Sequence, residues 1–362
     1  MEHVYALGVS CIESIQYWCA GWSSYFELVN HFANPHYVME ILFPLISIID
    51  SVFASQLLLC MAFGGWLNSV MKWWLLEDRP YWWVHETTYY ANSHHPQLQQ
   101  TPQSCETGPG SPSGHSVTAA SILILAVMWT SHILNDRKWD VRWWKACVYP
   151  LFGAALGSVM LARMFVATHF PHQVLLGSLL GLFMAPALCI YVTDPFIWRY
   201  STHSTMPVKE AVVWHAACAG LAMAIAVLTY CSLRLCGIDP DFTVQLAYRW
   251  CEAPDSIHVS TTPLYALVQC TASLLGWALC VTPAVAEYRH YTKNRSLLVS
   301  IFATGISIYL LKRLDANITS TSGVSFYALQ FILNVIKPAL LLRVVPTLAM
   351  WPYCSGKKQK NL

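Results

Sequence analysis

A series of long, nearly uncharged apolar runs occupies most of the 362 residues and limits the fold more than any other feature. A bilayer core about 30 Å thick needs roughly 20 mostly apolar helical residues to cross it. Nine stretches approach that length: about 37–54, 55–71, 116–134, 146–162, 173–192, 211–233, 264–286, 297–311 and 324–342. The first two follow each other directly, which is typical of a tight helical hairpin. The sequence therefore predicts an all-α fold, a polytopic membrane helical bundle of about nine transmembrane helices.

Composition excludes the main soluble classes of protein. Charged residues make up only 11% of the chain, whereas an ordinary soluble domain carries roughly 25%. The formal net charge of +2 gives no clustered basic surface of the kind that nucleic-acid binding requires, so no nucleic-acid partner is expected. The 13 cysteines are scattered and form no paired CxxC motif, so neither a zinc site nor a disulfide scaffold is predicted.

The N-terminal residues 1–36 follow a different pattern. Apolar side chains recur every three or four positions, at Val4, Leu7, Cys11, Ile15, Trp18, Trp22, Phe26 and Val29. Such a stripe predicts an amphipathic helix that lies on a membrane surface. We therefore divide the chain into an amphipathic segment at 1–36, a nine-span membrane domain at 37–351 and a basic tail at 352–362.

Basic residues predict the orientation of the spans. Twelve Lys and Arg residues lie in the connections 134–145, 193–210 and 283–296 and in the tail, and six lie on the opposite side. Loops rich in Lys and Arg remain in the cytosol. The C-terminus is therefore predicted to be cytosolic and the N-terminus to lie on the far side of the membrane.

Chemically reactive residues collect on that far side, in three separate connections. Lys72 and Arg79 follow the second span, the turn from Pro112 to His115 opens the third, and Arg163 and His169 follow the fourth. Each piece alone has a structural explanation, such as a snorkelling cation or a helix start. Their convergence on one membrane face favours a functional site.

The chemistry of these groups suits a phosphate monoester, which carries about −1.5 to −2 charges at neutral pH. Three cations, Lys72, Arg79 and Arg163, would bind its oxygens, since Arg can hold two oxygens at once. The glycine-rich turn at 108–114 and the start of the third span offer free backbone N–H groups for the remaining oxygens. Of two imidazoles, one would attack phosphorus and the other would protonate the leaving alcohol.

The order of these residues resembles a known signature. Lys72, Arg79-Pro80, Pro112-Ser113-Gly114-His115, and Arg163 with His169 resemble the three-part motif of the acid-phosphatase type 2 superfamily, which includes lipid phosphatases. Longer strings resemble the glucose-6-phosphatase catalytic subunits: residues 79–84 (RPYWWV), 104–115 (SCETGPGSPSGH) and 169–174 (HFPHQV). The string 250–254 (WCEAP) is similar to the ubiquitously expressed paralogue.

The resemblance implies a role for each matched residue. His169 would be the nucleophile that becomes phosphohistidine, and His115 the general acid and later base. Lys72, Arg79 and Arg163 would bind phosphate, and Ser113 and Gly114 would complete the pocket. The substrate would be glucose 6-phosphate or a close sugar phosphate, with neither metal nor cofactor.

The resemblance also implies a location. The protein would be a multi-pass protein of the endoplasmic reticulum membrane, in contact with membrane lipid, with a lumenal N-terminus and active site and a cytosolic C-terminus. A separate transporter would supply glucose 6-phosphate. Lys358 and Lys360, five and three places from the end, resemble a dilysine retrieval signal, and the alternative is a solvated basic tail.

Two other functions stay open at this point. One is a lipid phosphatase, although the superfamily Asp that orients the nucleophile is replaced here by Gln173, as in glucose-6-phosphatases. The other is a non-catalytic carrier or scaffold, although a transporter should show paired, interrupted helices. A metal site at His169 and His172 or at His94 and His95 is disfavoured because no carboxylate or cysteine cluster accompanies them. Five neighbours of the motifs receive no role: Asn68, Trp82, His85, Glu106 and His172.

Overall fold

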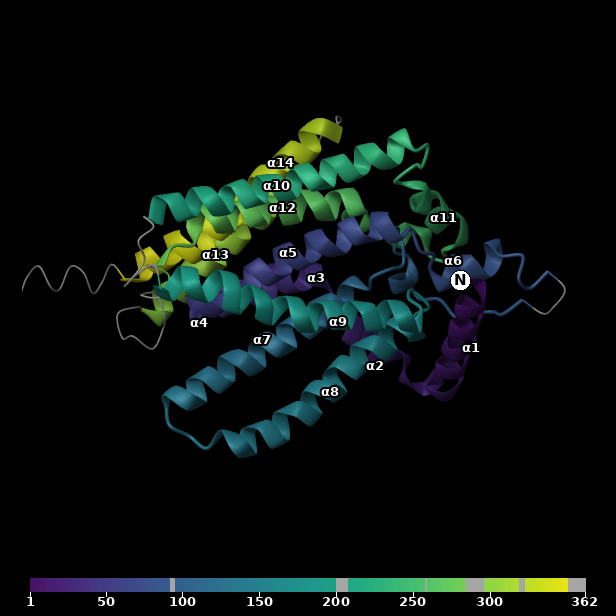
Figure 1. Cartoon of the computed structure of the whole chain (residues 1–362), viewed down its shortest axis with the longest axis horizontal. Coiled ribbons are helices and arrows are strands. Elements are labelled where there is room, and N and C mark those ends of the chain that lie inside the picture. Colours follow the sequence, from purple (N-terminus) through teal and green to yellow (C-terminus); the bar gives the residue numbers. More distant parts are fainter. Residues whose placement is uncertain are drawn as a thin grey trace, which may run out of the picture. The chain divides into compact units, whose positions relative to one another are not determined.

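The computed structural model describes residues 1–91, 95–199, 208–257, 259–283, 285, 296–318 and 323–350. These ranges are helical, with no strand among them. The helices are α1 Glu2–Trp18, α2 Ser23–Ala33, α3 Pro35–Tyr37, α4 Phe43–Ile49, α5 Ser51–Leu75, α6 Pro80–Glu86, α7 Gly114–Asp136, α8 Val141–Phe165, α9 Pro171–Leu188, α10 Val208–Leu235, α11 Phe242–Trp250, α12 Pro263–Cys280, α13 Leu297–Ala316 and α14 Gly323–Ala339 (Figure 1). The predicted all-α fold is confirmed.

Most of these helices meet the requirements of a membrane span. Within the described ranges, eight are long and apolar enough to cross a bilayer, and there are nine if Ala20–Ala33 and Pro35–Ile49 form one broken span. This agrees with the predicted bundle of about nine spans, except that part of the N-terminal amphipathic segment can contribute to the first one. The basic tail, with its two terminal lysines, and the connection that holds Lys293 and Arg295 lie outside the described residues.

The boundary between the first two predicted spans is wrong. Helix α4 ends at Ile49 and α5 begins at Ser51, so the chain breaks at Asp50 rather than after residue 54. Asp50 is extended (φ −148°, ψ 111°), and its carboxylate accepts hydrogen bonds from the N–H groups of Val52 (2.9 Å) and Phe53 (3.1 Å). A carboxylate in this position satisfies amide groups that the first helical turn leaves unpaired. A hydropathy pattern cannot predict such a helix cap.

The chain forms two compact units, each assembled from three separated segments. Unit 1 contains Met1–Pro35, Gly64–Ala185 and Ile225–Leu267, and unit 2 contains His36–Phe63, Pro186–Ala224 and Val268–Leu362. Every residue of the predicted site belongs to unit 1. The membrane domain proposed from sequence thus contains part of both units.

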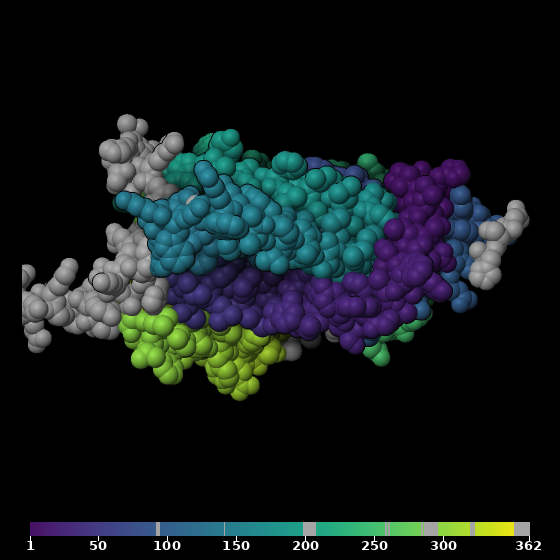
Figure 2. All heavy atoms as spheres, turned by 90° about the horizontal axis from the view of Figure 1, so that it is seen from below, coloured from purple at the N-terminus to yellow at the C-terminus, as the bar shows by residue number. Residues whose placement is uncertain are grey.

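In unit 1, α7 and α8 lie side by side, α2 packs against both, and α1 contacts α6 and α8 (Figure 1). Tyr5, Val9 and Ile12 of α1 are buried in the unit's apolar core. Only part of the apolar stripe noted in the sequence points outward: Leu7 and Trp18 are 74% and 81% exposed, whereas Phe26 is buried. The purple atoms of α1 are visible on the surface in the space-filling view (Figure 2). Helix α1 therefore has one apolar face against the protein and a second one that suits a membrane surface.

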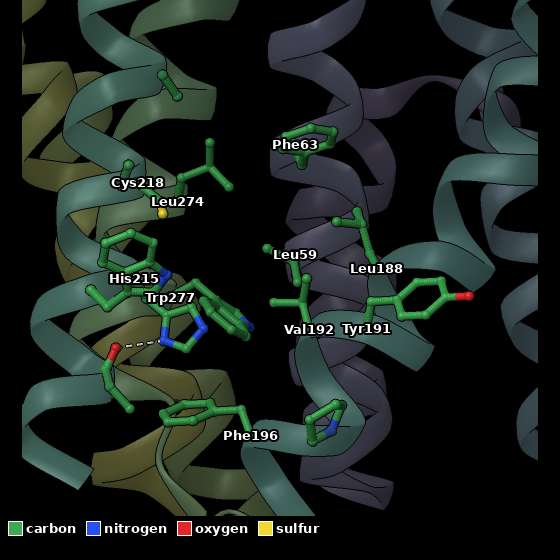
Figure 3. Close-up of a pocket in the computed structure, with 15 residues that line it drawn as sticks. Leu59, Phe63, Leu188, Tyr191, Val192, Phe196, His215, Cys218, Leu274 and Trp277 are labelled. Atoms are coloured by element: carbon green, nitrogen blue, oxygen red, sulfur yellow. Dashed lines mark hydrogen bonds between the residues drawn. The ribbon is translucent and has the colours of Figure 1, made fainter. Parts of the chain in front are cut away.

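Unit 2 contains a pocket of about 550 Å³ (Figure 3). Its walls include Leu59, Phe196 and Trp277, and its imidazole, His215, has Nδ1 2.7 Å from the carbonyl oxygen of Ala211. Neither a lysine, an arginine nor a carboxylate is among the described residues that line it. The pocket is therefore unsuited to a charged sugar phosphate.

Candidate active site

Three helix ends carry the cations of the predicted site. Lys72 lies in the last turn of α5, Arg79 immediately precedes α6, and Arg163 lies in the last turn of α8. Pro80 fixes the start of α6, where its missing N–H group costs nothing. Arg79 and Arg163 are 0% and 1% exposed, so each guanidinium requires partners inside the protein.

Backbone carbonyl groups hold Arg79 in place. Its Nε donates to the carbonyl oxygen of Gly108 (2.6 Å), and its two terminal nitrogens donate to those of Pro109 and Thr168 (3.3 Å each). Nη1 of Arg163 donates to Oδ1 of Asn30 at 3.1 Å. Both guanidinium groups are thus positioned by the scaffold itself.

Lys72 lies beside the arginines. Its Nζ is 3.5 Å from the position that a Cβ atom on Gly108 would occupy. It interacts electrostatically with Arg79 and Arg163. Lys72 therefore adds a third cation to the two arginines.

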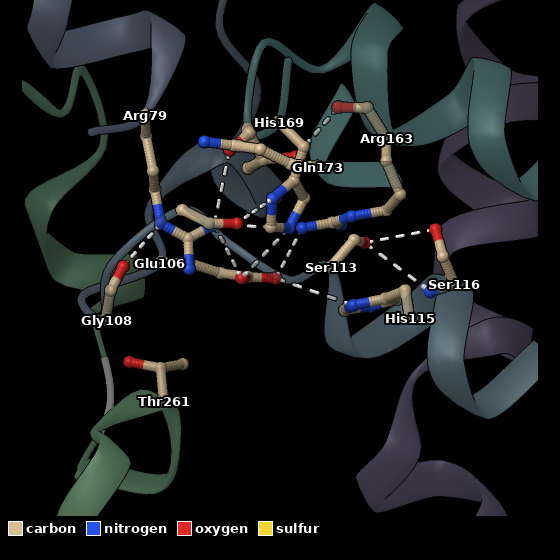
Figure 4. Close-up of polar contacts among 12 residues, drawn as sticks. Arg79, Glu106, Gly108, Ser113, His115, Ser116, Arg163, His169, Gln173 and Thr261 are labelled. Atoms are coloured by element: carbon tan, nitrogen blue, oxygen red, sulfur yellow. Dashed lines mark hydrogen bonds and ion pairs between the residues drawn. The ribbon is translucent and has the colours of Figure 1, made fainter. Parts of the chain in front are cut away.

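His169 points toward this cation cluster (Figure 4). Its Nδ1 lies 2.8 Å from the carbonyl oxygen of Gly110, and because a carbonyl can only accept, Nδ1 carries the proton. Nε2 then carries the lone pair and accepts a hydrogen bond from Nη1 of Arg79 at 3.4 Å. Burial, followed by Arg79 and Arg163, holds the pKa of His169 well below the ordinary value, although Glu106 opposes the shift. The imidazole is therefore neutral near pH 7, as a nucleophile must be.

Gln173 has a different task from the superfamily Asp that it replaces. Its Oε1 accepts from the N–H of Phe170 (3.1 Å), and its Nε2 donates to the carbonyl of Asp78 (2.9 Å) and to Glu77 (3.0 Å). It ties the backbone directly after the nucleophile to the residue directly before Arg79. The carbonyl of Gly110 performs the orienting contact that the sequence analysis associated with Gln173.

Only part of the glycine-rich turn can offer amide groups to an anion. The N–H groups of Gly110 and Ser113 already donate to the backbone carbonyls of Glu77 and Gln173 (2.7 and 3.1 Å). Gly114 and His115 begin α7, where an amide has no helical acceptor, and neither has an amide partner among the described residues. Of the expected amide donors, those of Gly110 and Ser113 are therefore occupied, whereas those of Gly114 and His115 can donate to an anion.

Ser113 caps α7, because its Oγ lies 3.4 Å from the amide nitrogen of Ser116 and accepts that N–H. This cap places the side chain of His115, which is 11% exposed, at the edge of the cation cluster. The structure therefore brings Lys72, Arg79, Arg163, Ser113, Gly114, His115 and His169 into one region of unit 1.

Glu106, to which the sequence assigned no role, is central to the site. The carboxylate of Glu106 lies among the cations, with Oε2 2.9 Å from Nη1 of Arg79 and Oε1 2.5 Å from Nη2 of Arg163. It is also 3.6 Å from Nδ1 of His115 and 3.9 Å from Nε2 of His169. Burial alone would raise the pKa of Glu106, but Arg163 and Arg79 outweigh it and hold that pKa well below its usual range. A single carboxylate in a loop belongs to no motif with a characteristic residue spacing. The only sequence signal for its role was its position on a membrane face where the sequence places several cations.

A disulfide, also not predicted, lies next to Glu106. It joins Cys105 to Cys251, whose Cα atoms are 5.5 Å apart, and links the loop before α7 to the segment after α11. Helix α11 in turn packs on α6. Across the described part of the chain, no group of three His, Cys, Asp or Glu residues is arranged to hold a metal ion.

Comparison with known proteins identifies relatives. The PAP2 superfamily matches residues 53–197. The chain is 32% identical to mouse glucose-6-phosphatase catalytic subunit 1 over 92% of its own length and 89% of the relative. It is 29% identical to human glucose-6-phosphatase 2 over 99% and 100%, and 30% identical to rat glucose-6-phosphatase 3 over 96% and 95%. None of the solved structures matches.

These identities are too similar to separate the three paralogues, so the resemblance to the ubiquitous one stays a prediction. The cations and imidazoles that the sequence predicted lie together in one site. The similarity to the glucose-6-phosphatase catalytic subunits extends over nearly the whole chain. The chain belongs to the glucose-6-phosphatase catalytic-subunit family of the PAP2 superfamily.

Proposed function

We propose that this protein is a membrane phosphohydrolase that cleaves glucose 6-phosphate, or a close sugar phosphate, to the free sugar and inorganic phosphate. One observation carries the proposal. A buried, neutral His169 directs Nε2 toward two arginines whose guanidinium groups the scaffold holds in place. The relatives that match nearly the whole chain are named glucose-6-phosphatases.

The first step transfers the phosphoryl group to the protein. The lone pair of His169 Nε2 forms a bond to phosphorus while the bond from phosphorus to the sugar oxygen breaks. His115 gives its proton to that oxygen, and the free sugar leaves. Arg79, Arg163 and Lys72 stabilise the charge on the phosphate oxygens, which is the main demand of phosphoryl transfer.

The second step regenerates His169. A water molecule attacks phosphorus, His115 accepts its proton, and the bond from Nε2 to phosphorus breaks, which releases inorganic phosphate. The amides of Gly114 and His115 at the start of α7 supply two further donors for the phosphate oxygens. Ser113 positions these amides through its cap on α7.

We infer that this site faces the lumen of the endoplasmic reticulum. The distribution of basic residues supports that orientation, and so does the disulfide of Cys105, directly before Glu106, because disulfides persist in oxidising compartments. A lumenal site requires a transporter to supply its substrate. The N-terminal segment would then be lumenal and the basic tail cytosolic.

A substrate panel in microsomes tests the function and the orientation. We expect hydrolysis of glucose 6-phosphate, a rate for phosphatidate at least tenfold lower, and a rise in glucose-6-phosphatase activity when detergent opens vesicles that lack the transporter. Preference for phosphatidate would overturn the proposed substrate. Equal activity in intact and opened vesicles would overturn the orientation.

A further inference from the structure

The carboxylate of Glu106 imitates a bound phosphate. Oε2 lies against Arg79 and Oε1 against Arg163. The same two oxygens also lie near the imidazoles, with Oε2 3.9 Å from Nε2 of His169 and Oε1 3.6 Å from Nδ1 of His115. The two oxygens therefore stand where two phosphate oxygens would lie, between the proposed nucleophile and the proposed acid (Figure 4).

We propose that Glu106 is a specificity-determining residue: its carboxylate holds the phosphate position until a substrate arrives, and a ligand binds only by displacing it. The inference rests on the proposed function, because it names the class of anion that the same site accepts. Dianionic phosphate monoesters can make this exchange with a net gain. Monoanions, such as phosphodiesters and sulfate esters, cannot.

The charges explain the distinction. Lys72, Arg79 and Arg163 provide three positive charges, and the Glu106 carboxylate neutralises one. A monoanion that replaces this carboxylate exchanges one negative charge for another, so the Coulomb energy of the cluster hardly changes. A dianion places a second negative charge among groups that are shielded from solvent, where charge interactions are much stronger than in water.

The geometry allows the side chain to leave while the backbone stays. The N–H of Glu106 donates to the carbonyl of Ser104, and its own carbonyl accepts the hydroxyl of Tyr81 (2.8 Å each). Its side chain is 20% exposed, whereas those of Arg79 and His169 are 0% exposed. Glu106 is therefore more exposed than the groups that it contacts, and we expect a rotation of its side chain to release the carboxylate.

Each arginine keeps at least one other partner without this carboxylate. Arg79 retains its three carbonyl partners, and Arg163 retains Asn30, when Glu106 moves away. Removing the charge of Glu106 should thus strengthen anion binding. If Glu106 were instead a brace for the arginines, its removal would weaken binding, so the two roles predict opposite signs.

The exchange also assists release of the product. Inorganic phosphate leaves a cluster of three cations, and the returning carboxylate takes its place. Loss of the charge should therefore lower KM for the substrate and make inorganic phosphate a stronger inhibitor. A merely structural residue would lower kcat without improving KM.

The experiment uses two non-hydrolysable ligands with the same phenyl body, phenylphosphonate and benzenesulfonate. Their binding to the detergent-solubilised full chain is measured by thermal stabilisation at about pH 8, where a phosphate-like head group is a dianion. Wild type should bind the phosphonate and fail to bind the sulfonate at tenfold higher concentration. Glu106→Gln should bind the phosphonate about tenfold more tightly and acquire measurable binding of the sulfonate.

The matched control is Glu13→Gln, the same change on the exposed surface of α1, which should leave both affinities unchanged. Unchanged or weaker phosphonate binding by Glu106→Gln overturns the inference. If that variant fails to fold, the wild-type comparison decides, because equal binding of the two ligands overturns the inference as well. Failure of wild type to hydrolyse any sugar phosphate would overturn the proposed function instead, and the binding measurements do not depend on turnover.

Discussion

The contact between Gly110 and His169 gives the sharpest prediction for catalysis. The carbonyl of Gly110 fixes the proton of His169 on Nδ1. The surroundings of Gly110 leave no room for a side chain at that position. A Cβ atom at this position would lie 2.3 Å from the carbonyl oxygen of Asp78 and 2.6 Å from Nε2 of Gln173. Ordinary contact begins at 3.4 Å, so Gly110→Ala must shift this turn by about 1 Å.

That shift acts directly on the nucleophile. A displacement of about 1 Å at a reacting group costs roughly a hundredfold in rate, which corresponds to about 2.7 kcal/mol of transition-state stabilisation. We therefore expect kcat of Gly110→Ala for glucose 6-phosphate to fall about a hundredfold. Overpacking should also reduce stability by about 1–3 kcal/mol, so the variant should still fold.

The assay measures kcat and KM in detergent-opened microsomes, normalised to protein level by immunoblot. Gly153→Ala is the control, because a Cβ there meets nothing within 4 Å on the outside of α8, and alanine is the better helix former. It should retain wild-type kcat. A Gly110→Ala variant with kcat within twofold of wild type would refute the orienting role of this carbonyl.

Three further predictions concern the same unit. His169→Ala should lose turnover completely, and the acid-labile phosphate that labels wild type during hydrolysis should be missing; full activity would contradict the covalent mechanism. The rate should follow a bell-shaped pH profile, because protonation of His169 removes the nucleophile. Since the pKa of His169 is lowered, the His169 ionisation should lie below the ordinary value of about 6.5. A flat profile between pH 5 and 8 would count against the pairing of acid and nucleophile. Cys105→Ser should lower stability by about 2–5 kcal/mol, measured as a lower melting temperature, and Cys251→Ser should add nothing to it, whereas additive losses would show that the two cysteines act separately.

The fold was largely predictable because the signals that define a membrane helix are local. A run of about 20 apolar residues must find lipid or a core, whatever the rest of the chain does. The break at Asp50 was missed because it depends on a carboxylate capping the next helix. The outward direction of Leu7 and Trp18 was consistent with a membrane surface, but the buried face of Tyr5 and Ile12 required a partner that the periodicity does not name.

The candidate site divides in the same way. The sequence by itself determined which cations and imidazoles are available, and their spacing ties each of them to a helix end. Only the tertiary structure decided which atoms meet: the carbonyl of Gly110 with His169, Cys105 with Cys251 and Glu106 with both arginines. These contacts join segments far apart in the chain, and a backbone carbonyl or a single carboxylate leaves no pattern in the sequence. Their energies arise from distance and burial, which exist only once the helices have packed.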